Sequence, residues 1–344
     1  MINIEVEHDS HYTYQTEVEL AHHLAYLRPR KTDWQKVLFT ELEISPKPDC
    51  QTENQDAFGN HRTFFTLSTP HAALLVRSRS VVTLADRYAN FDASQSVAWE
   101  EVRDALAYAL DRPYVAASEF AFLSPYVPRL IELRAYAERS FVPGRNLAEA
   151  SIELSSRIHE DFTYSPTATE VHTPILEAFN KRAGVCQDFS HILIGCLRAM
   201  GLSAQYVSGY LLTKPAPGTV KLRGADASHA WVAVYCPQAP GQWLELDPTN
   251  NVLTGPSHVR LAVGRDFGDV SPLRGVIRGG GDHQLAVGVT VQVMDAAPED
   301  QAPALTEKRQ SQTQSQTQSQ TQSQTQSQTQ SQTQSAATQT QSQA

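Results

Sequence analysis

Hydrophobic and polar positions alternate along the first 85 residues of the chain, a pattern that predicts β-strands. The segments that carry it are rich in Val, Thr, Tyr and Phe. They are residues 2–7, 10–20, 23–28, 36–44, 61–68 and 73–84. Turn-forming residues separate several of them. The pattern therefore predicts an antiparallel β-sandwich of about six strands in residues 1–85.

The apolar spacing becomes helical after residue 86. Apolar residues between 98 and 109 repeat at intervals of three and four, and further helices are expected at about 129–139 and 147–161. Thr173 and Pro174 predict the start of a short helix, with Thr as the cap and Pro in the first turn. We interpret residues 86–145 as a helical connector and residue 146 as the start of a core domain.

The most informative helix follows Cys186. From Phe189, apolar residues fall at i, i+3, i+4, i+7, i+8 and i+11, and Gly201 predicts the end of the helix. Gly184 interrupts the preceding segment, so we expect the helix to begin at or near Cys186. The free N–H groups and partial positive charge of a helix N-terminus favour a thiolate there. Taken alone, Cys186 is also compatible with a buried core cysteine.

A predicted β-hairpin brings a histidine and an aspartate together. Residues 229–235 and 241–247 both alternate, and Pro and Gly lie between them. If Tyr235 faces Gly241, His229 lies opposite Asp247, with Cβ atoms about 5 Å apart. A register shift of two residues would leave His229 and Asp247 diagonal to each other, and a shift of one residue would separate them. We expect the apolar face of the hairpin on the core and its mixed face at a cleft.

Together, these residues predict a nucleophilic site. The thiolate of Cys186 would act as a nucleophile beside His229, and Asp247 would hold the imidazole in one tautomer. Singly, a histidine in a strand and an aspartate before proline are usually structural. Their joint placement with Cys186 favours catalysis.

The segments around these residues resemble the transglutaminase-like superfamily. They read Gly-Val-Cys-Gln-Asp-Phe-Ser-His, Ser-His-Ala-Trp and Trp-Leu-Glu-Leu-Asp-Pro-Thr-Asn. The resemblance is greatest to bacterial transglutaminase-like proteins, often labelled cysteine proteases. Residues 263–276 and the β-rich start resemble these proteins too, so the likeness spans roughly residues 1–295.

The resemblance implies an α+β fold. An N-terminal antiparallel β-sandwich would precede a papain/transglutaminase-like core, with the nucleophile helix packed on an antiparallel sheet. It also implies that Cys186 is the nucleophile, His229 the general base and acid, and Asp247 the orienting acid. Members of the family include cross-linking enzymes, peptidases and deamidases, so the fold does not choose a reaction.

We therefore expect a cysteine-dependent amide hydrolase or acyltransferase that acts on a protein or peptide substrate through a thioester, with hydrolysis as the default. A catalytically inactive scaffold or binding protein is the alternative, and a metal-dependent hydrolase is a weaker third. Tyr164 is a candidate oxyanion donor or a packed ring. Gln187 is a weaker donor, because its side chain should project away from Cys186. Trp231 is expected to wall the cleft or to lie in the core.

The composition of the chain limits the functional classes that remain. The 344-residue chain carries 28 basic and 37 acidic residues, a net charge of −9, which supplies no basic surface for nucleic acid. It has no run of about 18 apolar residues that would span a membrane. Its acidic start does not resemble a signal peptide, so we expect a cytoplasmic location with reduced thiols. The four cysteines show no Cys-x-x-Cys spacing, so neither a metal nor another cofactor is expected. The oligomeric state cannot be read from the sequence.

Three further segments complete the division of the chain. Residues 214–227 form a Pro- and Gly-containing loop before His229, which we expect to border the substrate cleft. Residues 284–294 alternate and predict a last strand, so the core domain is taken as 146–296. Residues 297–344 are mostly a Gln-Ser-Gln-Thr repeat and predict a disordered tail. A neutral spacer is the favoured role for this tail, and binding is the alternative.

Overall fold

The computed structural model describes residues 1–111, 113–213, 224 and 226–294. Its larger sheet contains seven strands, in the order β2-β5-β1-β4-β3, with β13 and β14 also paired to β1. All pairs are antiparallel. The strands are β1 (Ile2–Ala25), β2 (Gln35–Ser45), β3 (Cys50–Gln55), β4 (His61–Leu67), β5 (His71–Leu84), β13 (Leu273–Gly279) and β14 (His283–Val293).

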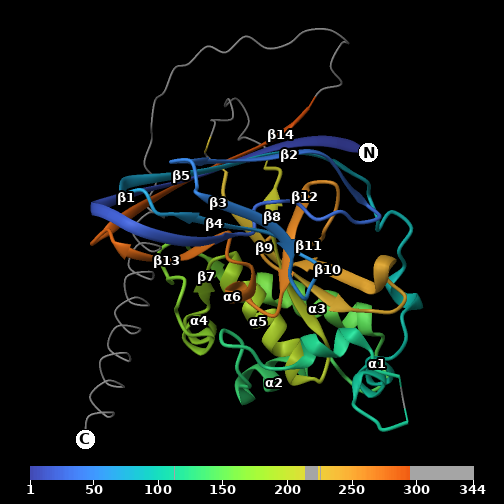
Figure 1. The fold of residues 1–344 in the computed structure, drawn as a ribbon. Helices are drawn as coiled ribbons and strands as arrows, with labels where there is room; N and C mark the ends of the chain where they lie inside the picture. Colours follow the sequence, from blue (N-terminus) through green and yellow to red (C-terminus); the bar gives the residue numbers. More distant parts are fainter. Residues whose placement is uncertain (112, 214–223, 225, 295–344) are drawn as a thin grey trace, which may run out of the picture.

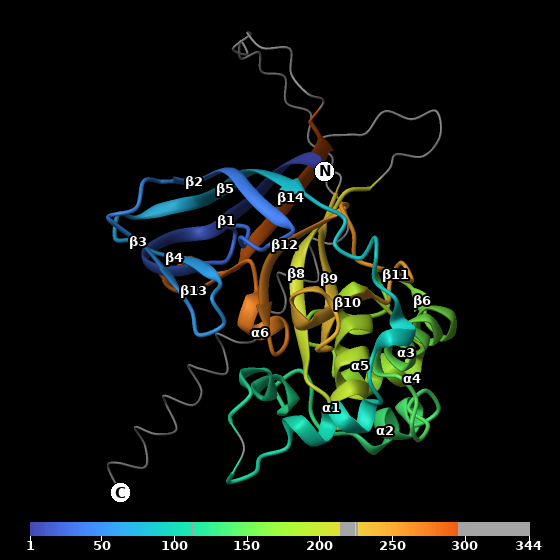
Figure 2. The ribbon, with the colours of Figure 1, turned by 90° about the vertical axis from the view of Figure 1, so that its right-hand side faces the viewer.

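Strand β1 runs through both halves of this domain. Its first half pairs with β5 and β14, and its second half, from Val18, pairs with β4 and β13. The β1–β5 register breaks between Thr13 and Val18, and Figure 2 shows β2 and β5 above β4 and β13. An apolar core that includes Phe65, Leu67 and Leu74 fills this domain. The predicted sandwich is confirmed, but the three strands expected within 2–28 are one 24-residue strand.

The last two strands close the first domain. The strand expected at 284–294 is β14, and it pairs with β1 over its whole length. The sequence division placed residues 273–293 with the core domain, whereas their pairing places them in the first sheet. The pairing of β14 with β1 joins residues more than 250 positions apart, and alternation alone does not choose between distant partners.

Helices follow the first sheet in the chain. They are η1 (Ala93–Gln95), α1 (Trp99–Leu106), η2 (Ala116–Ala121), α2 (Ile131–Ala137), α3 (Leu147–Asp161) and α4 (Ile175–Lys181). Helix α3 has the bounds expected from the sequence. The two-residue strands β6 (Thr163–Tyr164) and β7 (Ala183–Gly184) pair in parallel and lead the chain to Cys186.

The second sheet supports the nucleophile helix. Its order is β11-β10-β9-β8-β12, all antiparallel. These strands are β8 (Ala204–Leu211), β9 (Ser228–Tyr235), β10 (Trp243–Asp247), β11 (Val252–Leu253) and β12 (His258–Gly264), with η3 (Pro240–Gln242) before β10 and α6 (Phe267–Val270) after β12. Helix α5 (Cys186–Ala199) crosses this sheet next to β8 and β9 (Figure 1).

The core between α5 and the sheet is apolar. Ile192, Leu193 and Leu197 are fully buried, in one cluster with Val232 and Leu246. The apolar face of the hairpin therefore packs on the core as expected. Burial of each large side chain contributes about 1.5–3 kcal/mol to folding, so this contact fixes the helix against the sheet.

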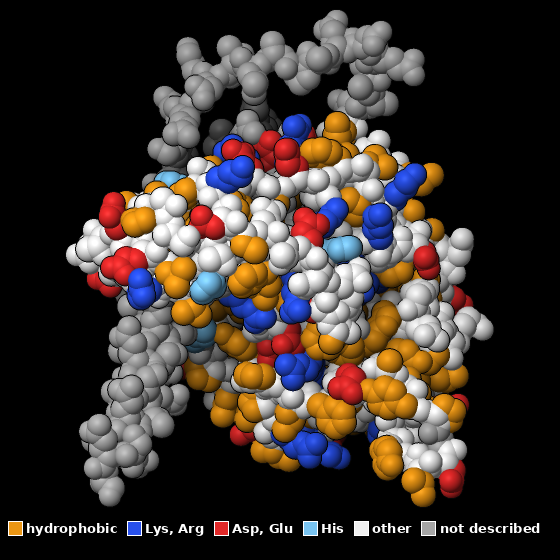
Figure 3. All heavy atoms as spheres, viewed as in Figure 1, with side chains coloured by type: hydrophobic (Ala, Val, Ile, Leu, Met, Phe, Trp, Pro, Cys, Tyr) orange, Lys and Arg blue, Asp and Glu red, His pale blue; other side chains and the backbone are white. Residues whose placement is uncertain are grey.

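Charges of both signs are interspersed on the face shown in Figure 3, and hydrophobic side chains gather at its lower right, near the segment that follows α1. Exposed large hydrophobic residues of that segment include Tyr108, Leu110 and Tyr114. Among the described residues, no helix has the length and apolar character needed to cross a bilayer.

Candidate active site

Cys186 is the first residue of α5, as predicted. Val185 is the cap residue, and its N–H donates to the carboxylate of Asp188 at 2.8 Å. Gly184 lies against that carboxylate: a Cβ added there would stand 2.5 Å from Asp188 Oδ2. The cap thus requires a glycine before the helix. Cys186 is partly exposed and unpaired, so it is accessible to a reagent.

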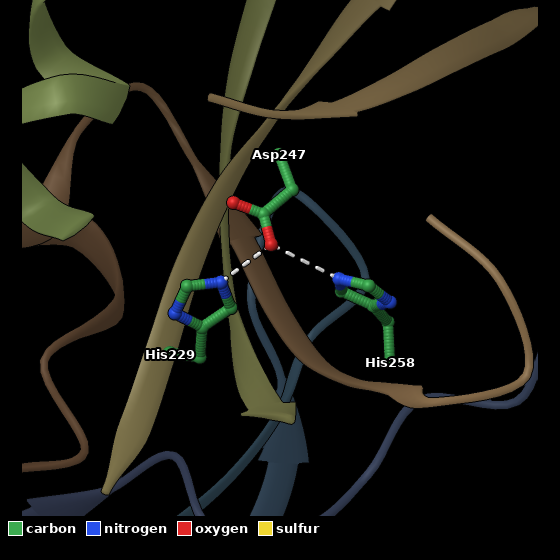
Figure 4. A group of neighbouring side chains, drawn as sticks. All are labelled: His229, Asp247 and His258. Atoms are coloured by element: carbon green, nitrogen blue, oxygen red, sulfur yellow. Dashed lines mark hydrogen bonds and ion pairs between the residues drawn. The ribbon is translucent and has the colours of Figure 1, made fainter. Parts of the chain in front are cut away.

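His229 and Asp247 are in contact. The Nε2 atom of His229 lies 2.8 Å from Oδ2 of Asp247 (Figure 4). Tyr235 faces Trp243 rather than Gly241, so the register is shifted by two residues and the pair is diagonal. The cause is the connection, where η3 is closed by a hydrogen bond from Cys236 N to Gln242 O. A diagonal pair still brings long side chains together.

The imidazole of His229 also interacts with Cys186. Burial lowers the pKa of His229, but hydrogen bonds to Asp247 and Cys186 and the negative charges of both raise it to about 10. Because Nε2 faces Asp247, Nδ1 is the nitrogen left for the sulfur. A protonated imidazole between two acidic groups stabilises negative charge on both of them. The structure thus brings Cys186, His229 and Asp247 together in that order.

Asp247 is fully buried and surrounded by donors. Its Oδ1 accepts the backbone N–H groups of Thr249 and Asn250 at 3.0 and 3.1 Å, and its Oδ2 accepts the Asn250 side-chain amide at 2.6 Å. Burial raises the pKa of Asp247, but hydrogen bonds to His229, His258 and Asn250 hold it well below its usual range. The carboxylate is therefore ionised and fixed in orientation.

His258 was missed by the sequence analysis. It is buried at the start of β12, and its Nε2 lies 3.1 Å from Asp247 Oδ2. Strands β8 and β9 separate β12 from β10 in the sheet. Gly209 of β8 leaves room for Trp231, whose ring packs against His258: a Cβ on Gly209 would stand 2.4 Å from that ring. Only the strand order and this glycine could have revealed the contact.

The ligand atoms of His229, Asp247 and His258 lie within 4.8 Å of one another, which makes this trio a candidate metal cluster in the described part of the chain. Both imidazoles stand at hydrogen-bond distance from the same oxygen, and the Asn250 amide donates to it as well. An N–H group aimed at that oxygen occupies the side from which a cation would bind. This donor set fits a hydrogen-bonded network better than a metal centre.

The other predicted site residues lie around Cys186. Tyr164 is half exposed, and burial together with the negative charge of Cys186 raises its pKa, so its phenol lies near the sulfur. Gln187 donates to the Val171 carbonyl at 2.8 Å and thus turns away, as expected. A second tyrosine, Tyr206 of β8, was not predicted. Burial and then Cys186 raise its pKa well above the ordinary value.

The mixed face of the hairpin is mostly buried, so the expectation that all of it borders a cleft is wrong. Trp231 is fully buried and donates to Glu245 at 2.8 Å. Glu245 in turn lies 3.2 Å from both Arg87 and Arg260. Arg260 belongs to the same sheet as Glu245, whereas Arg87 lies just after β5, so the Arg87 ion pair attaches the segment that follows the first sheet to the second sheet. The His229 end of this face is partly exposed, as are Tyr235 and Trp243 at its other end.

The loop expected at 214–227 lies mostly outside the described residues, as does the tail at 297–344. Of the loop, Asp226 is described, and its N–H donates to Val289 O on β14 at 2.9 Å. The end of the loop that precedes His229 is thus attached to the first sheet.

A nucleophile helix packed on an antiparallel sheet, with a cysteine, a histidine and an aspartate in that order, defines the papain-like class of thiol proteins. Family models agree. Residues 4–83 match the bacterial transglutaminase-like N-terminal region, and residues 134–248 match the transglutaminase-like superfamily. The chain belongs to the transglutaminase-like superfamily, as a bacterial member with this N-terminal region.

Similar proteins extend the match to most of the chain. An uncharacterized protein of Mycobacterium tuberculosis is 38% identical over 297 residues, 84% of this chain and 91% of the relative. An uncharacterized protein of Mycobacterium leprae is 30% identical over 292 residues, which are 85% of this chain and 99% of the relative. A protein-glutamine gamma-glutamyltransferase of Pseudomonas aeruginosa is 35% identical over 98 residues, which are 27% of this chain and 14% of that protein.

Among solved structures, a proposed cysteine protease of Cytophaga hutchinsonii superposes with a TM-score of 0.64. The superposition covers 89% of this chain and 94% of the other at 19% sequence identity. At this identity the likeness is one of fold. The α+β fold inferred from the sequence is therefore confirmed.

Proposed function

We propose that this protein is a thiol enzyme that attacks amide bonds of proteins or peptides through a thioester on Cys186. The observation that carries the proposal is the placement of His229 between Cys186 and the buried carboxylate of Asp247. A purely structural histidine needs no partly exposed cysteine on its other nitrogen. The inactive scaffold expected as the alternative does not account for this arrangement.

In the first half of the reaction, the sulfur of Cys186 attacks the amide carbonyl and forms a C–S bond. The N–H groups at the start of α5 are suited to stabilise the oxyanion, with Tyr164 as a second donor nearby. His229, held protonated by its two acidic neighbours, gives its proton to the nitrogen as the C–N bond breaks. The amine leaves, and the acyl group remains as a thioester.

In the second half, His229 accepts a proton from water as the water attacks the thioester. The carboxylic acid leaves, and the C–S bond breaks to restore the thiolate. An amine in place of water would give transamidation. We take hydrolysis as the default, because water needs no acceptor site.

We further propose a reducing, cytoplasmic setting. All four cysteines are unpaired, including the exposed Cys50. Free thiols at the surface are typical of compartments that keep them reduced.

Competition between Cys186 and Cys50 for iodoacetamide at neutral pH tests the proposal. Cys50 is the more exposed of the two, so accessibility alone predicts that Cys50 reacts first. We expect Cys186 to react first, since the thiolate is the nucleophile and His229 stabilises it. Cys50→Ser is the matched control and should keep full activity, whereas Cys186→Ser should lose it. Faster labelling of Cys50, or equal labelling of both, would show that Cys186 is not activated and would favour the scaffold.

A further inference from the structure

The tautomer of His258 is set by its surroundings. Its Nδ1 faces the N–H of Gly255 at 3.4 Å and the hydroxyl of Ser257 at 3.2 Å. A backbone N–H can only donate, so Nδ1 is the acceptor and Nε2 carries the proton. His258 therefore donates from Nε2 to Oδ2 of Asp247, the same oxygen that His229 uses.

Two imidazoles thus share one carboxylate oxygen. A carboxylate that accepts several hydrogen bonds is a weaker base, since its negative charge is spread over the donors. In agreement, the hydrogen bond from His258 is one of the contacts that lower the pKa of Asp247. The titratable groups that face His229 are Cys186 from α5, Asp247 from β10 and, at a ring separation of 6.2 Å, His258 from β12. Tyr164 of β6 is close enough to Cys186 for burial and then the charge of the sulfur to raise the pKa of its phenol.

We propose that His258 is a positioning residue that takes part of the charge of Asp247 and so favours the neutral form of His229, which accepts the proton of the attacking water in the thioester stage of the reaction. The inference rests on the proposed function of Cys186 and His229 and adds a fourth member to that group. His258 does not contact the sulfur or the substrate and acts only through Asp247.

The thioester stage is where this effect should be visible. Before acylation, the thiolate of Cys186 holds the proton on His229. After acylation the sulfur is neutral, so Asp247 is the remaining negative group that favours a protonated imidazole, and the donors on Asp247 decide how strongly it does so. His229 must be neutral to accept the proton of the attacking water. Removal of the His258 donor should therefore slow the hydrolysis of the thioester more than its formation.

His258→Gln and His258→Asn form a matched pair. The Nε2 atom of Gln lies as many bonds from Cβ as the Nε2 of His, so Gln can still donate to Asp247. Asn is one carbon shorter and cannot reach it. Both amides are polar and of similar size, so a general effect on packing should appear in both variants. Thermal unfolding of each variant and of the wild type checks the fold.

The probe is p-nitrophenyl acetate, because its leaving group departs without a proton. The thiolate attacks the ester carbonyl, p-nitrophenolate leaves, and an acetyl thioester forms. Water then releases acetate and restores the thiolate. The burst of p-nitrophenolate reports formation of the thioester, and the steady rate reports its hydrolysis.

For His258→Asn we expect an unchanged burst and a steady rate about tenfold lower, the effect of one hydrogen bond. Because the thioester accumulates, KM should fall with kcat, and kcat/KM should stay near the wild-type value. The rise of the steady rate with pH should move to higher pH. His258→Gln should match the wild type in all three readouts.

Equal behaviour of the two variants, or parallel loss of burst and steady rate in His258→Asn, would overturn the role of His258. Absence of a burst in the wild type would instead sink the proposed function. The two failures are therefore distinguishable in the same experiment.

Discussion

Substitution of Asp247 by asparagine perturbs the site in a way that the structure makes specific. The carboxylate accepts five N–H donors, two at Oδ1 and three at Oδ2. An amide offers one oxygen and one NH2 group. In either orientation, Asp247→Asn therefore directs its own N–H groups at existing donors, and the negative charge beside His229 is lost.

Both the free energy of unfolding of the protein and the pKa of His229 should change. Each buried donor that loses its acceptor costs about 1–3 kcal/mol, and two donors are affected at the least, so the free energy of unfolding should fall by about 2–6 kcal/mol. A hydrogen bond to a charged group contributes about 1.5–3 kcal/mol. At 1.36 kcal/mol per pKa unit, its loss lowers the pKa of His229 by about one to two units from its value of about 10.

The assay is the rate of iodoacetamide reaction at Cys186 as a function of pH. The alkaline limb of the profile follows loss of the His229 proton and should move down by about one to two pH units in Asp247→Asn. Steady hydrolysis of p-nitrophenyl acetate should fall by three to four orders of magnitude, on the order of the effect of this exchange in serine triads.

Asp266→Asn is the matched control for Asp247→Asn. Asp266 is also buried, but it accepts the backbone N–H groups of Tyr126 and Gly268 and does not contact His229. The Asp266→Asn variant should have a lower free energy of unfolding, but the alkaline limb of its alkylation profile should stay at the wild-type pH. A profile for Asp247→Asn that coincides with the wild type would refute the reasoning, because His229 would then not depend on the carboxylate.

Three further outcomes are expected. Burial lowers the pKa of His8 and His23 to about 4 and of His191 to about 3, so the unfolded chain binds more protons below pH 6.5. The free energy of unfolding in urea should then drop by about 1.4 kcal/mol per pH unit for each histidine between pH 6.5 and 4. His23→Phe should flatten this dependence, and a pH-independent stability would contradict it. Gly184→Ala should push on Asp188 and shift the start of α5, lowering both the melting temperature and the rate of Cys186 alkylation, whereas unchanged values would show that the cap is not strained. Dialysis against EDTA should leave ester hydrolysis intact while iodoacetamide abolishes it, and the reverse result would identify a metal centre.

The nucleophile helix could be predicted from the sequence because its signals are local. The interval of the apolar residues, the glycine before Cys186 and the stop at Gly201 all act within a few turns of chain. In the structure α5 begins at Cys186, and Gly201 adopts a φ of +81°. The alternating segments 229–235 and 241–247 were predicted for the same reason, although the second strand begins only at Trp243.

The exact register of the hairpin and the contact to His258 could not be predicted in this way. The register depends on how many residues the connection takes up, and here η3 absorbs two more than the sequence suggested. The approach of His258 to Asp247 depends on the order of five strands and on the close packing at Gly209. Both are properties of the whole sheet. The pairing of β14 with β1 is a third case, since it joins opposite ends of the described chain.

The identity of the acylated residue tests the central claim most directly. Wild-type protein is mixed with p-nitrophenyl acetate, quenched in acid within the burst and analysed by intact mass and peptide mapping. The account predicts one acetyl group per chain, attached to Cys186 and absent from Cys186→Ser. An acetyl group found on Cys50 or on lysines, or a chain that carries none, would contradict it.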